Sequence, residues 1–308
     1  MTQRTEYTFN ASALGLGGFF TRGGRQILVP SLASVALAPT GGEGWANVTN
    51  YDQDGIAFTR AESRVTGYET SRNFFTTYSD IYITNLSVFD TVRVAMMHAT
   101  VTSTRDTNSP ADEATFQLHA SYRGIDIDGY EVVPEIDIHT CGADYRTLLA
   151  KAIAELPGNE RDMSAAGRRD ALERGEPIRD TIVKGLKQNG GERVALRNDA
   201  NHVITVPGFG TIYFGELLVK RGRRRVNLLR FEFGNGHDHG PKKRYELHGD
   251  PQSVETYTVD ADPLKDDAPV ERMLLLSQTS SRTRPDSGSL TIASGDGNGE
   301  PVWPGRNG

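Results

Sequence analysis

Residues 5–13 read Thr-Glu-Tyr-Thr-Phe-Asn-Ala-Ser-Ala, and residues 114–122 read Ala-Thr-Phe-Gln-Leu-His-Ala-Ser-Tyr. In both stretches apolar side chains alternate with polar ones, which puts the apolar ones on a single face of an extended chain. This alternation is typical of a strand that buries one face in a core and turns the other to solvent. We therefore expect a mainly β protein.

The β pattern continues through most of the chain. Segments 211–219 and 226–233 are apolar on both faces and predict central strands that are covered on both sides. A change of parity near Thr84–Asn85 predicts a β-bulge. Because the chain also has 33 glycines, many of them at turns, we expect a two-sheet, sandwich-like body. The alternative is a β-solenoid, since glycines punctuate the strands.

Helical spacing interrupts this pattern in one region, where Asp144 is suited to cap a helix. Two apolar stripes follow it, formed by Tyr145, Leu148, Leu149, Ile153 and Leu156, and by Ile178, Ile182, Val183 and Leu186. The expected organisation is a β-rich part at 1–142, a helical insertion at 143–189, a β-rich part at 190–293 that completes the same body, and a flexible tail at 294–308.

Composition excludes several classes of protein. The formal net charge of −6 over 308 residues is no signature of general nucleic-acid binding. A single cysteine, Cys141, excludes an intramolecular disulfide scaffold. No Sec signal peptide or membrane-spanning segment is recognisable. From this sequence we expect a cytoplasmic protein, or a cell-surface protein if the chain is exported by a non-Sec route or a leader has been removed.

The most pointed candidate site is a basic hairpin between two apolar strands. Its anion-binding candidates are Lys220, Arg221, Arg223, Arg224 and Arg225. Five positive charges in one loop suit a phosphate, a sulfate or a polyanion, although a solvated turn has the same composition. No aromatic residue is interleaved, which argues against base stacking and specific nucleic-acid binding. The acidic stretch 250–267 offers the hairpin a partner, within the chain or on a neighbour.

Candidates for metal binding and catalysis are weaker. The weak metal-ligand candidates are His237 and His239, which a polar loop also explains. Further imidazoles are available at His139, His202 and His248, but their spacing is not that of a zinc site. Cys141 follows His139 by two residues. A Cys–His pair is the minimum that a thiol nucleophile requires. Asp296–Glu300 resembles the start of a calcium loop, but a disordered glycine-rich tail fits better. We expect no cofactor and no enzyme activity.

Three stretches carry a resemblance to a known family. They are ASALGLGG at Ala11–Gly18 with ILVPSLASVALAPTGGEG at Ile27–Gly44, ITNLSVFDTVRVAMMHATVTS at Ile83–Ser103, and VITVPGFGTIYFGELLV at Val203–Val219. The chain resembles, at the level of pattern over roughly its first three-quarters, the choice-of-anchor P type of bacterial surface protein. The resemblance implies a β-rich module displayed outside the cell, with no catalytic residues to carry over.

Together these features predict a non-catalytic structural or binding module of the bacterial surface-protein type that self-assembles into a homo-oligomer through complementary charge and open strand edges. The alternative is a protein that binds a carbohydrate or polyanion through the basic hairpin at 220–225 and exposed aromatic residues such as Trp45. A third and weaker hypothesis is a metal-dependent enzyme that uses His237 and His239.

Overall fold

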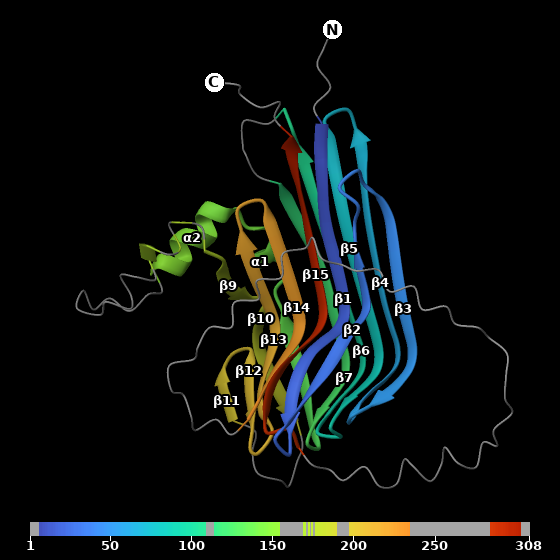
Figure 1. Ribbon diagram of the computed structural model, residues 1–308. Helices are drawn as coiled ribbons and strands as arrows, with labels where there is room; N and C mark the ends of the chain where they lie inside the picture. The colour runs from blue at the N-terminus through green and yellow to red at the C-terminus, as the bar shows by residue number, and fades with distance from the viewer. Residues whose placement is uncertain are drawn as a thin grey trace, which may run out of the picture.

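The computed structural model describes residues 6–108, 114–154, 169–170, 172, 174, 176–189, 197–234 and 284–302. Within these residues the chain forms two antiparallel β-sheets that pack face to face, with two short helices at one side (Figure 1). The prediction of a mainly β, sandwich-like body is confirmed. The β-solenoid alternative is wrong, because the described strands pair within two sheets and do not wind into successive coils.

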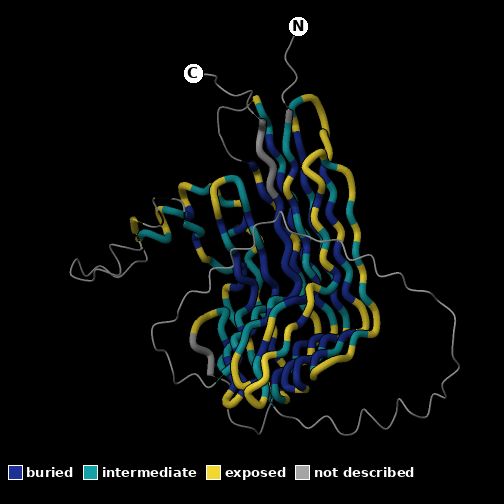
Figure 2. Tube along the Cα trace, in the orientation of Figure 1, coloured by how far each residue is buried: buried dark blue, intermediate teal, exposed yellow. Residues whose placement is uncertain are grey.

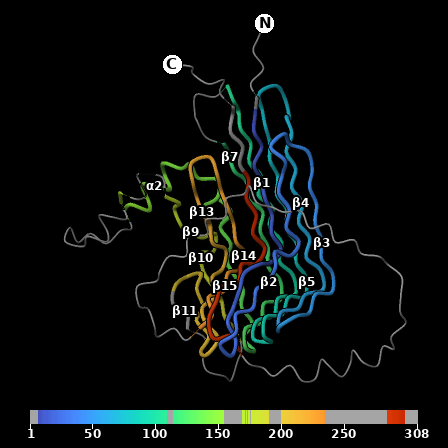
Figure 3. The backbone as a smooth tube through the Cα atoms, viewed as in Figure 1, coloured from blue at the N-terminus to red at the C-terminus, as the bar shows by residue number. Residues whose placement is uncertain are grey.

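Sheet A combines strands from both ends of the chain. In spatial order its strands are β11 (Arg197–Ala200), β12 (Val203–Val206), β13 (Gly210–Lys220), β14 (Arg223–Phe233), β15 (Ser287–Val302), β1 (Glu6–Arg22) and β2 (Arg25–Ala36), with β9 (Ile178–Thr181) beside β13. The last strand, β15, lies between β14 and β1 and pairs antiparallel with both (Figure 3). The two β-rich parts of the chain therefore share one sheet.

Sheet B is a meander of consecutive hairpins with one added strand. In spatial order its strands are β10 (Val183–Asn189), β8 (Tyr130–Ile136), β7 (Thr115–Ile127), β6 (Val92–Asp106), β5 (Phe74–Val88), β4 (Ile56–Ser71) and β3 (Gly42–Gln53). The buried residues of β5 change parity at Asn85, which has a φ of 51°. The register of β5 with β4 and β6 is the same on both sides of Asn85, so the predicted β-bulge is wrong.

The core lies between the sheets, and Figure 2 shows it as long buried runs along the central strands. At one end, aromatic rings from both sheets interlock edge to face. The ring centroid of Phe20 lies 5.0 Å from that of Phe89, which in turn lies 5.5 Å from that of Phe233. Aromatic pairs favour this T-shaped arrangement. The packing holds the two sheets as one body and leaves the outer face of each turned away from the core.

Residues 294–302 belong to β15, so the prediction of a flexible tail that begins at residue 294 is wrong for them. Gly295 shows why their composition misleads. A Cβ at this position would lie 2.3 Å from Cδ1 of Ile81 in sheet B. Glycine is therefore needed where the sheets approach closely. The interpretation of Asp296–Glu300 as a disordered tail fails with it, because this segment pairs with β1.

Residues 178–189 form strands, so the helical prediction for the second apolar stripe is wrong. β9 extends sheet A and β10 extends sheet B, and the chain crosses between the sheets at Ile182. Ile178, Ile182 and Val183 are all buried. Their β-branched side chains suit extended backbone. The helix-like spacing arises because two short strands meet at the crossing.

The first part of the predicted insertion is helical, in α1 (His139–Gly142) and α2 (Tyr145–Ala154). Oδ1 of Asp144 accepts a hydrogen bond from the backbone N–H of Thr147 at 2.9 Å, which is the predicted N-cap contact. In the first stripe, Leu148 is buried and Leu149 is half-buried. Leu156, the last residue of that stripe, lies outside the described residues.

Candidate functional site

The basic hairpin has its predicted turn, but its arginines do not all face solvent. β13 ends at Lys220 and β14 begins at Arg223. Nη2 of Arg225 donates to Oδ2 of Asp296 in β15 at 3.0 Å, and Nη2 of Arg223 contacts the same oxygen. Asp296 is only 1% exposed. Arg223 and Arg225 are therefore engaged by a buried carboxylate of their own sheet.

Arg224 is buried in the body and is 1% exposed. Its Nη1 donates to the carbonyl of Lys220 at 2.8 Å, and its Nη2 donates to the carbonyl of Ala143 at 3.0 Å. Its guanidinium carbon lies 4.6 Å from the ring centroid of Phe116. The prediction of an anion-binding site is wrong for Arg224.

The part of the chain that the structure describes includes the thiol candidate but neither of the two metal-ligand candidates. Cys141 lies in α1 and is buried, and burial raises its pKa to about 11, so the thiol stays protonated near neutral pH. His237, His239 and the acidic stretch 250–267 lie outside the described residues. Among the residues that the structure describes, no group of three or more His, Cys, Asp or Glu side chains is arranged to hold a metal ion.

A different surface, which the sequence did not single out, carries an ordered array of polar and aromatic side chains. It is the outer face of sheet B from β3 to β7, and we call it the lattice face. Strand register aligns its residues in three rows, which are Glu43, Thr66, Tyr78, Thr102 and Gln117; Trp45, Arg64, Asp80, Thr100 and His119; and Asn47, Glu62, Tyr82, His98 and Ser121. Neighbours in a row are about 4.8 Å apart, and rows are about 6.8 Å apart.

Side-chain contacts between strands hold the centre of the lattice face in place. Oδ1 of Asp80 accepts a hydrogen bond from the Thr100 hydroxyl at 2.6 Å and lies 2.7 Å from Nε2 of His98. Nε of Arg64 lies 2.8 Å from Oε1 of Glu43. Burial, and then the negative charge of Asp80, raises the pKa of the Tyr78 hydroxyl. That hydroxyl stays protonated and keeps a hydrogen to donate.

The Thr100, His98 and Asp80 side chains do not form a catalytic relay. In such a relay, the imidazole uses one nitrogen for the hydroxyl and the other for the carboxylate. Here Nε2 of His98 lies 2.7 Å from Asp80 and 3.4 Å from the Thr100 hydroxyl, so one nitrogen faces both groups. The cluster suits hydrogen bonding to a ligand better than activation of a nucleophile.

Aromatic rings stand among these polar groups. Trp45 on the edge strand β3 is 56% exposed, and its Nε1 donates to Oε1 of Glu62 at 3.0 Å. Tyr78 and Tyr82 lie on the same face of β5, two strands away, at a separation of about 9.6 Å across the sheet. The lattice face thus combines exposed ring surface with hydrogen-bond donors and acceptors of both charges.

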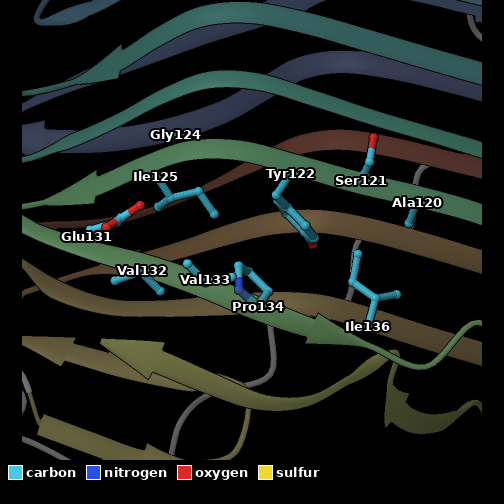
Figure 4. Close-up of a pocket in the computed structure, with 10 residues that line it drawn as sticks. All are labelled: Ala120, Ser121, Tyr122, Gly124, Ile125, Glu131, Val132, Val133, Pro134 and Ile136. Carbon is cyan, nitrogen blue, oxygen red and sulfur yellow. The ribbon is translucent and has the colours of Figure 1, made fainter. Parts of the chain in front are cut away.

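A pit opens in sheet B beside the lattice face (Figure 4). β7 and β8 pair only near their turn, from Ile125 with Val132 to Ile127 with Tyr130, and then diverge. The pit has a volume of about 210 Å³. It is lined by Ala120, Ser121, Tyr122, Gly124, Ile125, Glu131, Val132, Val133, Pro134 and Ile136. Ser121 belongs both to the pit and to the lattice face, so the two are continuous.

One family model matches the part of the chain that holds the lattice face and the pit. The model described as "Domain of unknown function (DUF8256)" matches residues 7–174, which run from β1 past α2. The chain belongs to this family. The DUF8256 match includes the whole lattice face and the whole pit, whereas the basic hairpin and β15 lie beyond it. No curated protein and no solved structure matches the chain. None of the described helices is long and apolar enough to cross a membrane.

Proposed function

We propose that this protein is a non-catalytic glycan-binding module whose ligand lies across the lattice face. The observation that carries the proposal is the row of Trp45, Arg64, Asp80, Thr100 and His119, which crosses five strands in register. A sugar chain presents apolar C–H faces and a rim of hydroxyl groups. An exposed indole matches the first, and charged and hydroxyl side chains match the second.

The charges of the lattice face favour a neutral glycan over a polyanion. Arg64 pairs with Glu43, and Arg60 pairs with Glu62, so acidic and basic groups alternate across the strands. Each carboxylate can accept from a hydroxyl, and each guanidinium can donate to one. The proposal therefore keeps the carbohydrate alternative but moves it from the basic hairpin to the lattice face. The resemblance to bacterial surface proteins supports it, because a displayed module meets glycans.

Replacing Trp45 with alanine is expected to weaken glycan binding about tenfold, because the loss of one stacking ring costs on the order of 1–2 kcal/mol. Tyr82→Ala should lower the affinity by a similar factor. The measurement is isothermal titration calorimetry of the full chain with a panel of neutral oligosaccharides. Leu28→Ala is the matched control, since Leu28 is 77% exposed on sheet A and should leave the affinity unchanged. The proposal fails if no oligosaccharide of the panel binds, or if Leu28→Ala and Trp45→Ala weaken binding equally.

Self-association is a second proposal, and the edge of sheet B favours it. Within the described residues β3 pairs only with β4, so its other edge offers backbone groups along twelve residues. β2, one of the two edge strands of sheet A, is less open because it contains Pro30, which has no N–H.

We expect the wild-type mass in sedimentation experiments to rise with concentration. The double variant Asn47→Lys, Thr49→Lys should lower it by placing two charges on the β3 edge. A wild-type protein that stays monomeric at high concentration would remove this proposal. A double variant that associates as strongly as the wild type would show that the β3 edge is not the contact.

A further inference from the structure

We propose that the pit between β7 and β8 receives the acetamido group of an N-acetylated amino sugar. This inference rests on the proposed function and names its ligand class: a neutral glycan that lies on the lattice face and carries N-acetyl groups. The lattice face and the pit meet at Ser121. A sugar positioned over the row of Tyr82, His98 and Ser121 would therefore have one end above the mouth of the pit.

The shape of the pit selects a compact group. Its narrow end is the β7–β8 hairpin, where Ile127 pairs with Tyr130. At the other end α1 follows β8 and packs on β7, with Gly142 against the carbonyl of Phe116. Both ends are thus closed, and an added β-strand could not run through the gap. A volume of about 210 Å³ is several times the space that one water needs and is enough for a small pendant group.

The walls of the pit match the two halves of an acetamido group. Ala120, the ring of Tyr122, Ile125, Val132 and Ile136 make its interior apolar, which suits a methyl group. In Figure 4, Tyr122 lies on the β7 side of the gap, and Pro134 and Ile136 lie on the β8 side. Because the strands diverge, backbone groups of β7 and β8 that would pair in a continuous sheet face the gap. Those groups suit an amide.

The rim of the pit disfavours an acidic sugar. Glu131 lines it and is exposed, and a carboxylate at the mouth repels a carboxylate on the ligand. Val133, another exposed residue of the rim, is 42% exposed and adds apolar surface. The residues around the mouth therefore favour a neutral amide substituent over a uronic acid or a lactyl ether.

The test compares three tetrasaccharides of equal length by calorimetry with the full chain: an N-acetylglucosamine oligomer, its de-N-acetylated form and a cello-oligomer. Wild type should prefer the acetylated oligomer over the cello-oligomer by about tenfold, from one buried methyl and one amide hydrogen bond. Val133→Trp places a large side chain at the mouth and should abolish the preference while cello-oligomer binding persists. Ile138→Trp is the matched control, because Ile138 is 43% exposed but does not line the pit.

Each outcome separates this inference from the proposed function. Equal affinity of the wild type for the acetylated and cello-oligomers would overturn the inference and leave the proposed function standing. A preference that survives in Val133→Trp would also overturn it, because the acetamido group would then bind elsewhere. If no oligomer binds to the wild type, the proposed function fails and this inference fails with it.

Discussion

Replacing Arg224 with alanine is expected to lower the free energy of unfolding by about 3 kcal/mol, the scale of a buried network with a cavity left behind. The guanidinium joins the β13–β14 hairpin to the end of α1 through the carbonyls of Lys220 and Ala143, and it packs on Phe116. Removing it leaves two carbonyls of partly buried hydrogen bonds without these donors. It also removes an aliphatic stem that fills core space.

A companion variant separates the two contributions. Arg224→Met keeps most of the volume and removes only the donors, so its loss should fall between that of Arg224→Ala and zero. Urea unfolding followed by circular dichroism measures all three proteins. Arg93→Ala is the control, because the Arg93 side chain is 62% exposed, and its loss should stay below about 0.5 kcal/mol. An Arg224→Ala protein as stable as this control would show that the buried contacts contribute nothing.

Much of the fold could be predicted from local pattern. Alternation predicts β1 and β7, parity predicts the irregularity at Asn85 although not its form, and two-sided apolar segments predict β13 and β14. Each of these signals is read within one segment. The exception is β15, whose glycines are typical of a tail when taken alone. The reason for one of them, Gly295, is a tertiary contact: Ile81 of the opposite sheet lies where a Cβ would otherwise stand.

The candidate site depends on register, which local pattern does not contain. Parity alone predicts that Arg64, Asp80 and Thr100 each face outward on their own strand. That they stand side by side follows from hairpin pairing across β4, β5 and β6. The pit exists because the hydrogen-bonded pairing of β7 with β8 ends at Ile125 and Val132 and the two strands then separate. Exposed Trp45 was the one signal in the sequence that pointed to the lattice face.

The basic hairpin is a case in which the local sequence pattern predicts a site that the structure does not form as expected. A run of arginines in a turn predicts a charged surface, yet the partner of Arg223 and Arg225 is Asp296, which is 73 residues from Arg223 and 71 from Arg225. No local feature joins them. Asp296 also accepts from the backbone N–H of Ser12 at 2.7 Å and from the Ser12 hydroxyl at 2.9 Å. One buried carboxylate thus ties together β14, β15 and β1, the central strands of sheet A.

The pKa of this carboxyl decides how its contribution varies with pH. Burial alone would raise the pKa of Asp296, but the positive charges of Arg223 and Arg225 and their hydrogen bonds outweigh burial and hold it below the usual value. An aspartate in the unfolded chain has a pKa of about 3.9. The unfolded chain therefore takes up the proton more readily. The stabilisation is complete above about pH 4 and is lost as the pH falls through the folded-state pKa.

Asp296→Asn is accordingly expected to cost about 2–3 kcal/mol at neutral pH, because it removes the charge that two arginines share but keeps an acceptor for Ser12. Below about pH 4 the difference from wild type should shrink, since the wild-type carboxylate itself becomes protonated. Urea unfolding from pH 7 to pH 2.5 measures both effects. Asp54→Asn is the matched control: its partner is also an arginine, Arg22 at 3.3 Å, but the Asp54 side chain is 49% exposed, and an exposed pair contributes at most about 1 kcal/mol. A constant difference between wild type and Asp296→Asn across this range would contradict the assignment of the pH dependence to Asp296.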